Sequence, residues 1–216
     1  MKYPLVVFDW DGTLLDSAGA IVMAIQAASR DLGLAVPDDA RARHVIGLGL
    51  VDALRHAVPD LPAERYQAMV DRYRHHYLSG DHQLTLFAGV HELLRGLRER
   101  GHMLAIATGK SRIGLERALD HSDLRTFFQG SRCADECHSK PHPQMLEELL
   151  LEFGVDATQA VMIGDTSHDL LMAENAGVAS LAVTYGAHPY EHLLAHRPLA
   201  CLHSVSELDQ WLQANG

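Results

Sequence analysis

Six polar side chains are predicted to meet at one edge of a sheet, where they could carry out chemistry together. They are Asp9, Asp11, Thr108, Lys140, Asp165 and Asp169. In open α/β sheets, ligands bind beyond the carboxyl ends of the strands, which is where most of these residues fall. Gathered carboxylates repel one another and need a cation or a shared proton. A set of oxygen ligands without histidine or thiolate favours Mg²⁺, so the pattern predicts a magnesium site.

The spacing of the first two aspartates indicates phosphoryl transfer. Asp9 directly follows an apolar run, and a carboxylate beside bound Mg²⁺ stays ionised and can attack phosphorus. Aspartate is an established covalent phosphoryl acceptor. Asp11 comes two residues later, where a tight turn can aim it at the leaving oxygen. Gly12 and Thr13 fit that turn, and their amides are candidates for an anion-binding nest.

The elements that position these residues alternate along the chain. Short apolar runs at 5–8, 103–107, 160–163 and 180–183 are typical of strands buried on both faces. Helical patterns at 90–97 and 145–153 lie between them, which predicts a parallel sheet covered on both faces. Thr108 ends the second run, and Lys140 lies in a loop before the third. We expect them to offer a hydroxyl and a cation to the phosphoryl oxygens.

Residues 16–82 interrupt this alternation with helical patterns and without convincing strands. One helical stripe ends at Gly33, and Tyr66–Tyr77 forms part of another, in which the tyrosines are interpreted as core packing. A helical segment between the first two strands predicts an inserted domain. The predicted division is therefore a core of residues 1–15 and 83–216 and a helical insertion of residues 16–82.

Composition excludes several classes of protein. A formal charge of −10 over 216 residues argues against a nucleic-acid surface, because phosphate backbones are bound by clustered lysine and arginine. No apolar run approaches the roughly 20 residues of a membrane span, and the first residues do not resemble a signal peptide. Three cysteines without a C-x-x-C pair favour a reducing compartment, and the 15 histidines show no metal-ligand spacing. We therefore expect a cytoplasmic protein with neither a nucleic-acid nor a membrane partner.

Four segments resemble, in order, the motifs of the haloacid dehalogenase superfamily. Phe8–Ser17 resembles its first motif, DxDGT, and Thr108 resembles the second. Lys140-Pro141 resembles the third motif and Gly164–Asp169 the fourth. The ordered set spans nearly the whole chain. The resemblance implies a Rossmann-like core and a helical cap inserted just after the first motif.

The resemblance also implies a role for each of these residues. Asp9 would be the nucleophile and Asp11 the general acid and base. Magnesium would bind Asp9, the backbone carbonyl of Asp11, and Asp165. Asp169 would orient Lys140 or a metal-bound water.

Within the superfamily, the chain is most similar to the phosphoglycolate-phosphatase-like subgroup. Gly47 and Gly49 belong to a segment that resembles the cap loop facing the active site there, although such a segment can also be a simple turn between helices. Gly109 and Lys110 are further candidates for phosphate contacts. The sequence Thr108-Gly109-Lys110 departs, however, from the Thr-Asn-Lys of phosphoglycolate phosphatases, which leaves the substrate open.

The sequence therefore predicts a phosphoric monoester hydrolase that uses Mg²⁺ to hydrolyse a small, phosphoglycolate-like metabolite, acting as a monomer or a homodimer. Asp11 argues against dehalogenation, and the lack of lysine in residues 16–82 argues against phosphonate hydrolysis. A sugar-phosphate mutase keeps both aspartates and remains the alternative within the superfamily. A phospho-receiver or binding protein is the alternative from another class, although receivers lack a helical insertion.

Overall fold

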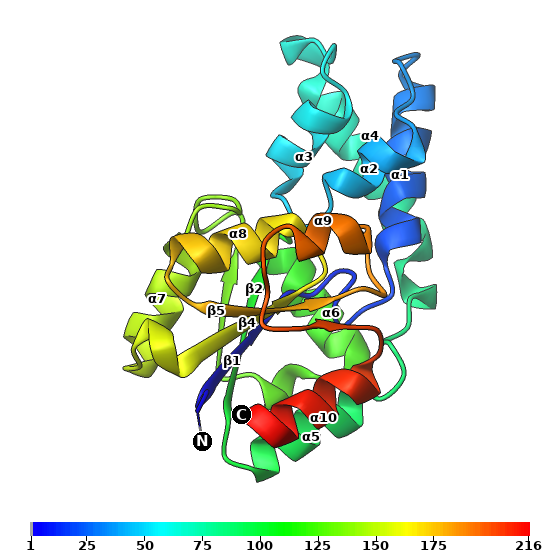
Figure 1. Ribbon diagram of the computed structural model, residues 1–216. Coiled ribbons are helices and arrows are strands. Elements are labelled where there is room, and N and C mark those ends of the chain that lie inside the picture. The colour runs from blue at the N-terminus through cyan, green and yellow to red at the C-terminus, as the bar shows by residue number, and fades with distance from the viewer. Residues whose placement is uncertain (1) are drawn as a thin grey trace.

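A computed structural model describes residues 2–216 and shows a parallel sheet between two layers of helices (Figure 1). The strands are β1 (Leu5–Phe8), β2 (Met103–Thr108), β3 (Gly130–Cys133), β4 (Ala160–Gly164), β5 (Ala179–Val183) and β6 (Cys201–Leu202). They lie in the order β3-β2-β1-β4-β5-β6, and every neighbouring pair is parallel. The predicted α/β class with a Rossmann-like parallel sheet is confirmed.

Ten α-helices accompany the sheet within the described residues. They are α1 (Ala18–Asp31), α2 (Asp39–His44), α3 (Leu50–Ala57), α4 (Tyr66–Gly80), α5 (Val90–Glu99), α6 (Arg112–Ser122), α7 (Gln144–Phe153), α8 (Ser167–Asn175), α9 (Tyr190–Leu194) and α10 (Val205–Asn215). Short 3-10 helices occupy Ala63–Arg65, Asp81–Gln83, Arg125–Phe127 and Ala157–Gln159. In the described part of the chain, no helix has both the length and the apolar character of a membrane span.

The central strand shows why the sheet is buried on both faces. Side chains alternate across a strand, so Val6 and Phe8 face one layer and Leu5 and Val7 face the other. The first pair packs with apolar side chains of α5, α6 and α10. The second pair packs with those of α7 and α8. A continuous apolar run therefore makes a strand with no polar face.

The order of the strands brings the predicted site residues to one edge. β1 lies between β2 and β4, with Phe8 level with Ile106 on one side and Ile163 on the other. The backbone N–H of Asp9 donates to the carbonyl of Ile163 over 2.9 Å. The next residues of three adjacent strands therefore emerge together at a point where the strand order reverses.

Helices α1 to α4 stand together beyond this edge of the sheet (Figure 1). They share a hydrophobic cluster of their own, in which α1 packs along α4. The described residues 16–82 contain helices and turns without a strand, as expected. Two connecting segments lead to this group, and they touch where the N–H of Asp16 donates to the carbonyl of Thr85 over 3.0 Å. The domain limits at residues 16 and 82 stay a prediction.

The sequence analysis did not predict strands β3 and β6. Three of the four residues of β3 are only partly buried, and Arg132 in this strand pairs with Glu148 over 2.6 Å and with Glu152 over 2.8 Å. Strand β6 has only two residues. Both strands lie at the edges of the sheet, where polar side chains reach solvent and an apolar run is not required.

Candidate active site

Asp9 occupies the centre of the site and is 1% exposed. The Nζ of Lys140 lies 2.8 Å from Asp9 Oδ1 and forms a buried ion pair with it. Among the described residues, no other donor reaches either carboxylate oxygen of Asp9. Burial raises the pKa of Asp9 well above its usual value, Lys140 opposes this rise, and the charges of Asp169 and Asp165 add to it. The site is therefore short of positive charge.

Asp165 lies beside Asp9 and is held by the core. It accepts hydrogen bonds from the hydroxyl of Thr13 over 2.8 Å and from the N–H of Ala187 over 2.7 Å. Burial, followed by the charge of Asp169, raises the pKa of Asp165 to about 7. Carboxylate oxygens of Asp9, Asp165 and Asp169 lie within 4.8 Å of one another. The Asp9 oxygen that Lys140 does not contact and the excess of buried carboxylates fit a divalent cation with oxygen ligands.

Asp169 has a different environment from the other two carboxylates. Its Oδ1 accepts from Lys140 Nζ over 2.7 Å. Its Oδ2 accepts from the N–H and the hydroxyl of Thr166, over 3.1 Å and 2.7 Å, in the capping box that begins α8. Both oxygens are therefore engaged. Asp169 thus holds the Lys140 ammonium beside Asp9, and its expected place outside the direct ligands of the cation stays a prediction.

Asp11 is held by Ser17, at the start of α1, and by Lys110 of the core, which also contacts the helical group. It accepts from the hydroxyl of Ser17 over 2.7 Å, and both of its oxygens lie 3.0 Å from Lys110 Nζ. The same Nζ donates to the hydroxyl of Tyr77 in α4 over 3.0 Å. Burial acts to lower the pKa of Lys110, but Asp11 and the nearby tyrosines raise it overall, so the lysine stays charged. Tyr77 packs in the helical cluster as expected and, in addition, contacts this lysine.

The turn at Gly12 and Thr13 was predicted to offer free amides to an anion, but these amides make hydrogen bonds within the chain. The amide of Gly12 already donates to the carbonyl of Leu15 over 2.8 Å, and the amide of Thr13 donates to the carbonyl of Trp10 over 3.4 Å. Gly12 has φ 81°, and an added Cβ there would lie 2.1 Å from Asp165 Oδ2. The glycine is therefore required for the close approach of Asp165, and its amide is not free to bind phosphate. Thr108 is fully buried at the end of β2.

The glycine-rich segment of the helical group rests on the loops that follow the strands. The N–H of Gly49 donates to the hydroxyl of Ser139 over 2.9 Å. An added Cβ at Gly109 would lie 2.4 Å from the carbonyl oxygen of Leu48 and 2.6 Å from that of Gly47. Real Cβ atoms do not approach so closely, so the loop occupies the space that a side chain at residue 109 would fill. A residue with a side chain at position 109 would therefore force this loop to move.

A histidine cluster beside the site was missed by sequence reasoning. The carbonyl of His44, at the end of α2, accepts from Nε2 of His168 over 2.7 Å and from Nε2 of His188 over 3.1 Å. Nδ1 of His188 accepts from the N–H of Ser167 over 3.0 Å, so its proton lies on Nε2. Both nitrogens of His188 are thus engaged. The cluster fastens the helical group to the core instead of presenting three free metal ligands.

The fold and the site together define a member of the haloacid dehalogenase-like hydrolases. The model of that family matches residues 6–183, which include all four segments that resemble its motifs. The chain belongs to this family.

Relatives extend over the whole chain. A protein of Dickeya dadantii named "Probable phosphatase IndB" is 39% identical over 95% of this chain and 91% of its own. A "5'-nucleotidase" of Pseudomonas aeruginosa is 32% identical over 100% of this chain and 98% of its own. A crystal structure described as a "predicted phosphoglycolate phosphatase from haemophilus somnus 129pt" has a TM-score of 0.88. It is 24% identical, covers 99% of both chains and supports the fold alone.

Proposed function

We propose that this chain is a magnesium-dependent phosphatase that hydrolyses a small phosphomonoester through an aspartyl-phosphate on Asp9. The observation that carries the proposal is the buried carboxylate of Asp9, which lies among two further buried carboxylates and has one close counter-charge, the ammonium of Lys140 at 2.8 Å. A buried carboxylate with too little positive charge around it is costly, and groups perturbed in this way cluster at functional sites. Membership in a hydrolase family, with relatives named as phosphatases, supports this reaction.

The proposed cation is Mg²⁺, held by Asp9, Asp165 and the backbone carbonyl of Asp11. Asp9 and Asp165 offer carboxylate oxygens within 4.8 Å of each other, at a site with an excess of negative charge. Bound there, Mg²⁺ would screen the negative charges of the nucleophile and the substrate phosphate from each other. The second oxygen of Asp9 would stay free to react.

In the first proposed step, a carboxylate oxygen of Asp9 attacks phosphorus and the bond to the ester oxygen breaks. Asp11 gives its proton to that oxygen, which leaves as an alcohol. Lys140, with the hydroxyl of Thr108, stabilises charge on the phosphoryl oxygens. Asp169 and Thr166 hold Lys140 in place, through the hydrogen bonds of 2.7 Å that Asp169 accepts from each.

In the second proposed step, Asp11 takes a proton from water and the water oxygen attacks the phosphorus of the aspartyl-phosphate. The bond between phosphorus and Asp9 breaks, so the carboxylate is regenerated and inorganic phosphate leaves. Ser17 and Lys110 hold the Asp11 carboxylate for both steps, over 2.7 Å and 3.0 Å. A positioned acid or base of this kind typically contributes about 10²–10⁴-fold in rate.

Residues 16–82 are proposed to form a cap that closes over the site and excludes bulk water. Three contacts between this segment and the core support the proposal: Gly49 with Ser139, Tyr77 with Lys110, and the carbonyl of His44 with His168. We retain the cytoplasm as the proposed location, because all three cysteines are free thiols. Neither a nucleic acid nor a membrane is proposed as a partner, and monomer and homodimer stay open.

The test is turnover by the purified chain. With Mg²⁺, wild-type protein should release inorganic phosphate from p-nitrophenyl phosphate and from at least one small phosphorylated metabolite. Acid-quenched wild-type protein should carry a phosphoryl group on the peptide that contains Asp9, and Asp9→Asn should abolish both signals. Formation of an isomeric phosphate ester without release of phosphate would instead identify a mutase. Absence of turnover on every ester would refute the proposed function.

A further inference from the structure

The first and last helices of the helical group both lead to Asp11, the proposed acid and base. The hydroxyl of Ser17, immediately before α1, donates to Asp11 Oδ1 over 2.7 Å. In α4, the hydroxyl of Tyr77 accepts from Lys110 Nζ over 3.0 Å, and the same Nζ lies 3.0 Å from both oxygens of Asp11. Because α1 packs along α4, a movement of this pair relative to the core reaches Asp11 by both connections.

Lys110 depends on its partners to stay in one position, because a lysine ammonium sits at the end of a long, flexible stem. Its Nζ carries three N–H donors. Within the described part of the chain, the hydrogen-bond partners of Nζ are the two oxygens of Asp11 and the hydroxyl of Tyr77. The three partners use the three donors and hold the ammonium. Without the Tyr77 hydroxyl, one donor loses its partner and the lysine is free to turn.

The hydroxyl of Tyr77 is itself fixed by the packing of the helical group. Tyr77 is buried, and its ring stacks on that of Tyr73 with centroids 5.9 Å and planes 16° apart. Burial raises the pKa of Tyr77, so its hydroxyl stays neutral and accepts from the ammonium. Asp81, which follows α4, pairs with Arg117 of α6 over 2.9 Å. The hydroxyl therefore meets Lys110 only where the end of α4 is docked on the core.

The charge of Lys110 connects this arrangement with the second proposed step. An ammonium that faces both oxygens of Asp11 pairs with an ionised carboxylate. An ionised Asp11 is what takes a proton from water when the aspartyl-phosphate is hydrolysed. A base must also be correctly oriented, since a small displacement costs much of its contribution to the rate. The contact of Tyr77 with Lys110 therefore bears on hydrolysis of the phosphoenzyme more than on its formation.

We infer that Tyr77 is a positioning residue that couples docking of the helical group to hydrolysis of the aspartyl-phosphate. The inference rests on the proposed function and assigns a step of that reaction to one hydroxyl of the helical group. Tyr77 does not touch the reacting atoms and acts through Lys110 on Asp11. When the helical group is docked, Lys110 has all three partners and the base is held in place. When the group moves away, the tyrosine hydroxyl leaves Lys110 and the base loses this support.

The test measures the two chemical steps separately in the full chain. Radiolabelled p-nitrophenyl phosphate with Mg²⁺ loads the protein, and the rate of the nitrophenol burst measures formation of the phosphoenzyme. A chase with excess unlabelled ester then allows the loss of label from acid-quenched protein to measure its hydrolysis. In Tyr77→Phe, this loss should be about tenfold slower than in wild type, as expected for one missing hydrogen bond to a charged group. The burst rate should stay near that of wild type.

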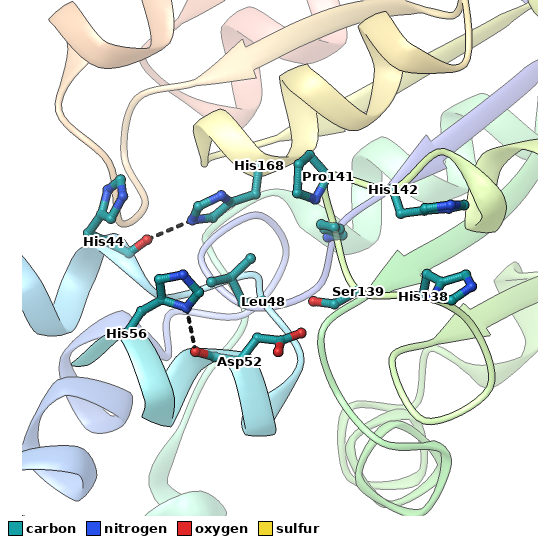
Figure 2. Close-up of a pocket in the computed structure, with 10 residues that line it drawn as sticks. His44, Leu48, Asp52, His56, His138, Ser139, Pro141, His142 and His168 are labelled. Atoms are coloured by element: carbon teal, nitrogen blue, oxygen red, sulfur yellow. Dashed lines mark hydrogen bonds between the residues drawn. The ribbon is translucent and has the colours of Figure 1, made fainter. Parts of the chain in front are cut away.

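Two control variants separate this role from a general effect on the helical group. Tyr66→Phe removes a hydroxyl from the same helix, but that hydroxyl donates to the carbonyl of Val51 inside the helical group. Both rates should remain those of wild type. Ser139→Ala removes the acceptor of the Gly49 N–H and so weakens docking at a contact that does not involve Lys110. It should slow both steps to a similar extent. Figure 2 shows Ser139 in the lining of a pocket between the helical group and the core.

A double variant tests whether Tyr77 acts through Lys110. Lys110→Met should slow the loss of label at least as much as Tyr77→Phe does. The double variant should then be no slower than Lys110→Met alone, because both substitutions break one connection. Effects that multiply would show that Tyr77 acts elsewhere and would overturn the inference. A wild-type rate of loss in Tyr77→Phe would do the same, as would equal slowing of the burst.

The same experiment distinguishes this inference from the proposed function. A wild-type protein that never carries label after acid quenching refutes the aspartyl-phosphate, and the inference falls with it. A labelled wild-type protein together with an unaffected Tyr77→Phe refutes the inference alone and leaves the proposed function in place.

Discussion

Replacing Gly109 by alanine should impair catalysis by preventing full closure of the helical group. The added Cβ would lie 2.4 Å from the carbonyl oxygen of Leu48 and 2.6 Å from that of Gly47. Both are backbone atoms, so no side-chain rotation relieves the contact. The loop must move away from the strand end by a substantial part of an ångström. Overpacking of this kind typically costs about 1–3 kcal/mol.

The expected loss in kcat/KM follows from that cost. If closure of the helical group costs about 2 kcal/mol more in the variant than in wild type, the ratio of closed to open form falls about 30-fold, since about 1.4 kcal/mol is tenfold. We expect a fall of similar size in kcat/KM for the best metabolite substrate, measured by phosphate release with Mg²⁺. The circular dichroism spectrum should be unchanged, because the contact joins two loops and no strand or helix contains it.

Two further alanine variants provide a graded control. Gly49→Ala would meet Ala134 at 3.1 Å and Ser139 at 3.4 Å, so a smaller loss is expected. Gly19→Ala, in α1, has open space around the new methyl group and should retain wild-type kcat/KM. Wild-type kcat/KM in Gly109→Ala, or an equal loss in Gly19→Ala, would refute the steric argument.

Three other predictions concern the aspartates, the cation and acid stability. Asp11→Asn should release about one equivalent of nitrophenol from p-nitrophenyl phosphate in a burst and then nearly stop, because its base is missing; wild-type steady-state turnover would contradict this. Saturating Ca²⁺ should not replace Mg²⁺, since it tolerates bidentate carboxylates and would occupy both oxygens of Asp9; equal rates would argue against the proposed ligands. Burial lowers the pKa of His102 from its usual value of 6.5, so the folded state favours the neutral ring. The free energy of unfolding that this preference contributes is complete above about pH 6.5 and is lost as the pH falls through the lowered pKa. Between about pH 7.5 and about pH 5, an interval that spans the ordinary pKa of histidine, the thermal midpoint of His102→Gln should therefore fall less than that of wild type. If the two midpoints fall in parallel, His102 does not contribute to acid sensitivity.

The fold class and the reacting residues could be predicted from the sequence because their signals are local. An apolar run such as Leu5–Phe8 forms a strand buried on both faces, and the residue that follows must emerge at the carboxyl edge of the sheet. The positions of Asp9 and Asp165 follow from this rule alone. Gly101 and Gly154 both have positive φ just after α5 and α7, a position at which glycine commonly ends a helix.

The edge strands β3 and β6 could not be predicted from apolar runs in the sequence. Strand β3 has one fully buried residue in four, and its sequence, Gly-Ser-Arg-Cys, contains no apolar run. Its pairing with β2 depends on backbone hydrogen bonds and on the salt bridges of Arg132 with α7. Such contacts join segments distant in sequence and leave no periodic pattern.

The sequence by itself indicated the proposed nucleophile, the proposed acid and base, and the order of the elements that carry them, because each signal lies in neighbouring residues. Only the tertiary structure decided which groups meet across long separations. It placed the Leu48 carbonyl where a side chain of residue 109 would stand, and it brought Lys110 between Asp11 and Tyr77. It also gathered His44, His168 and His188 from separate segments. These contacts form when the helical group packs against the sheet. The spacing of residues along the chain therefore cannot predict them.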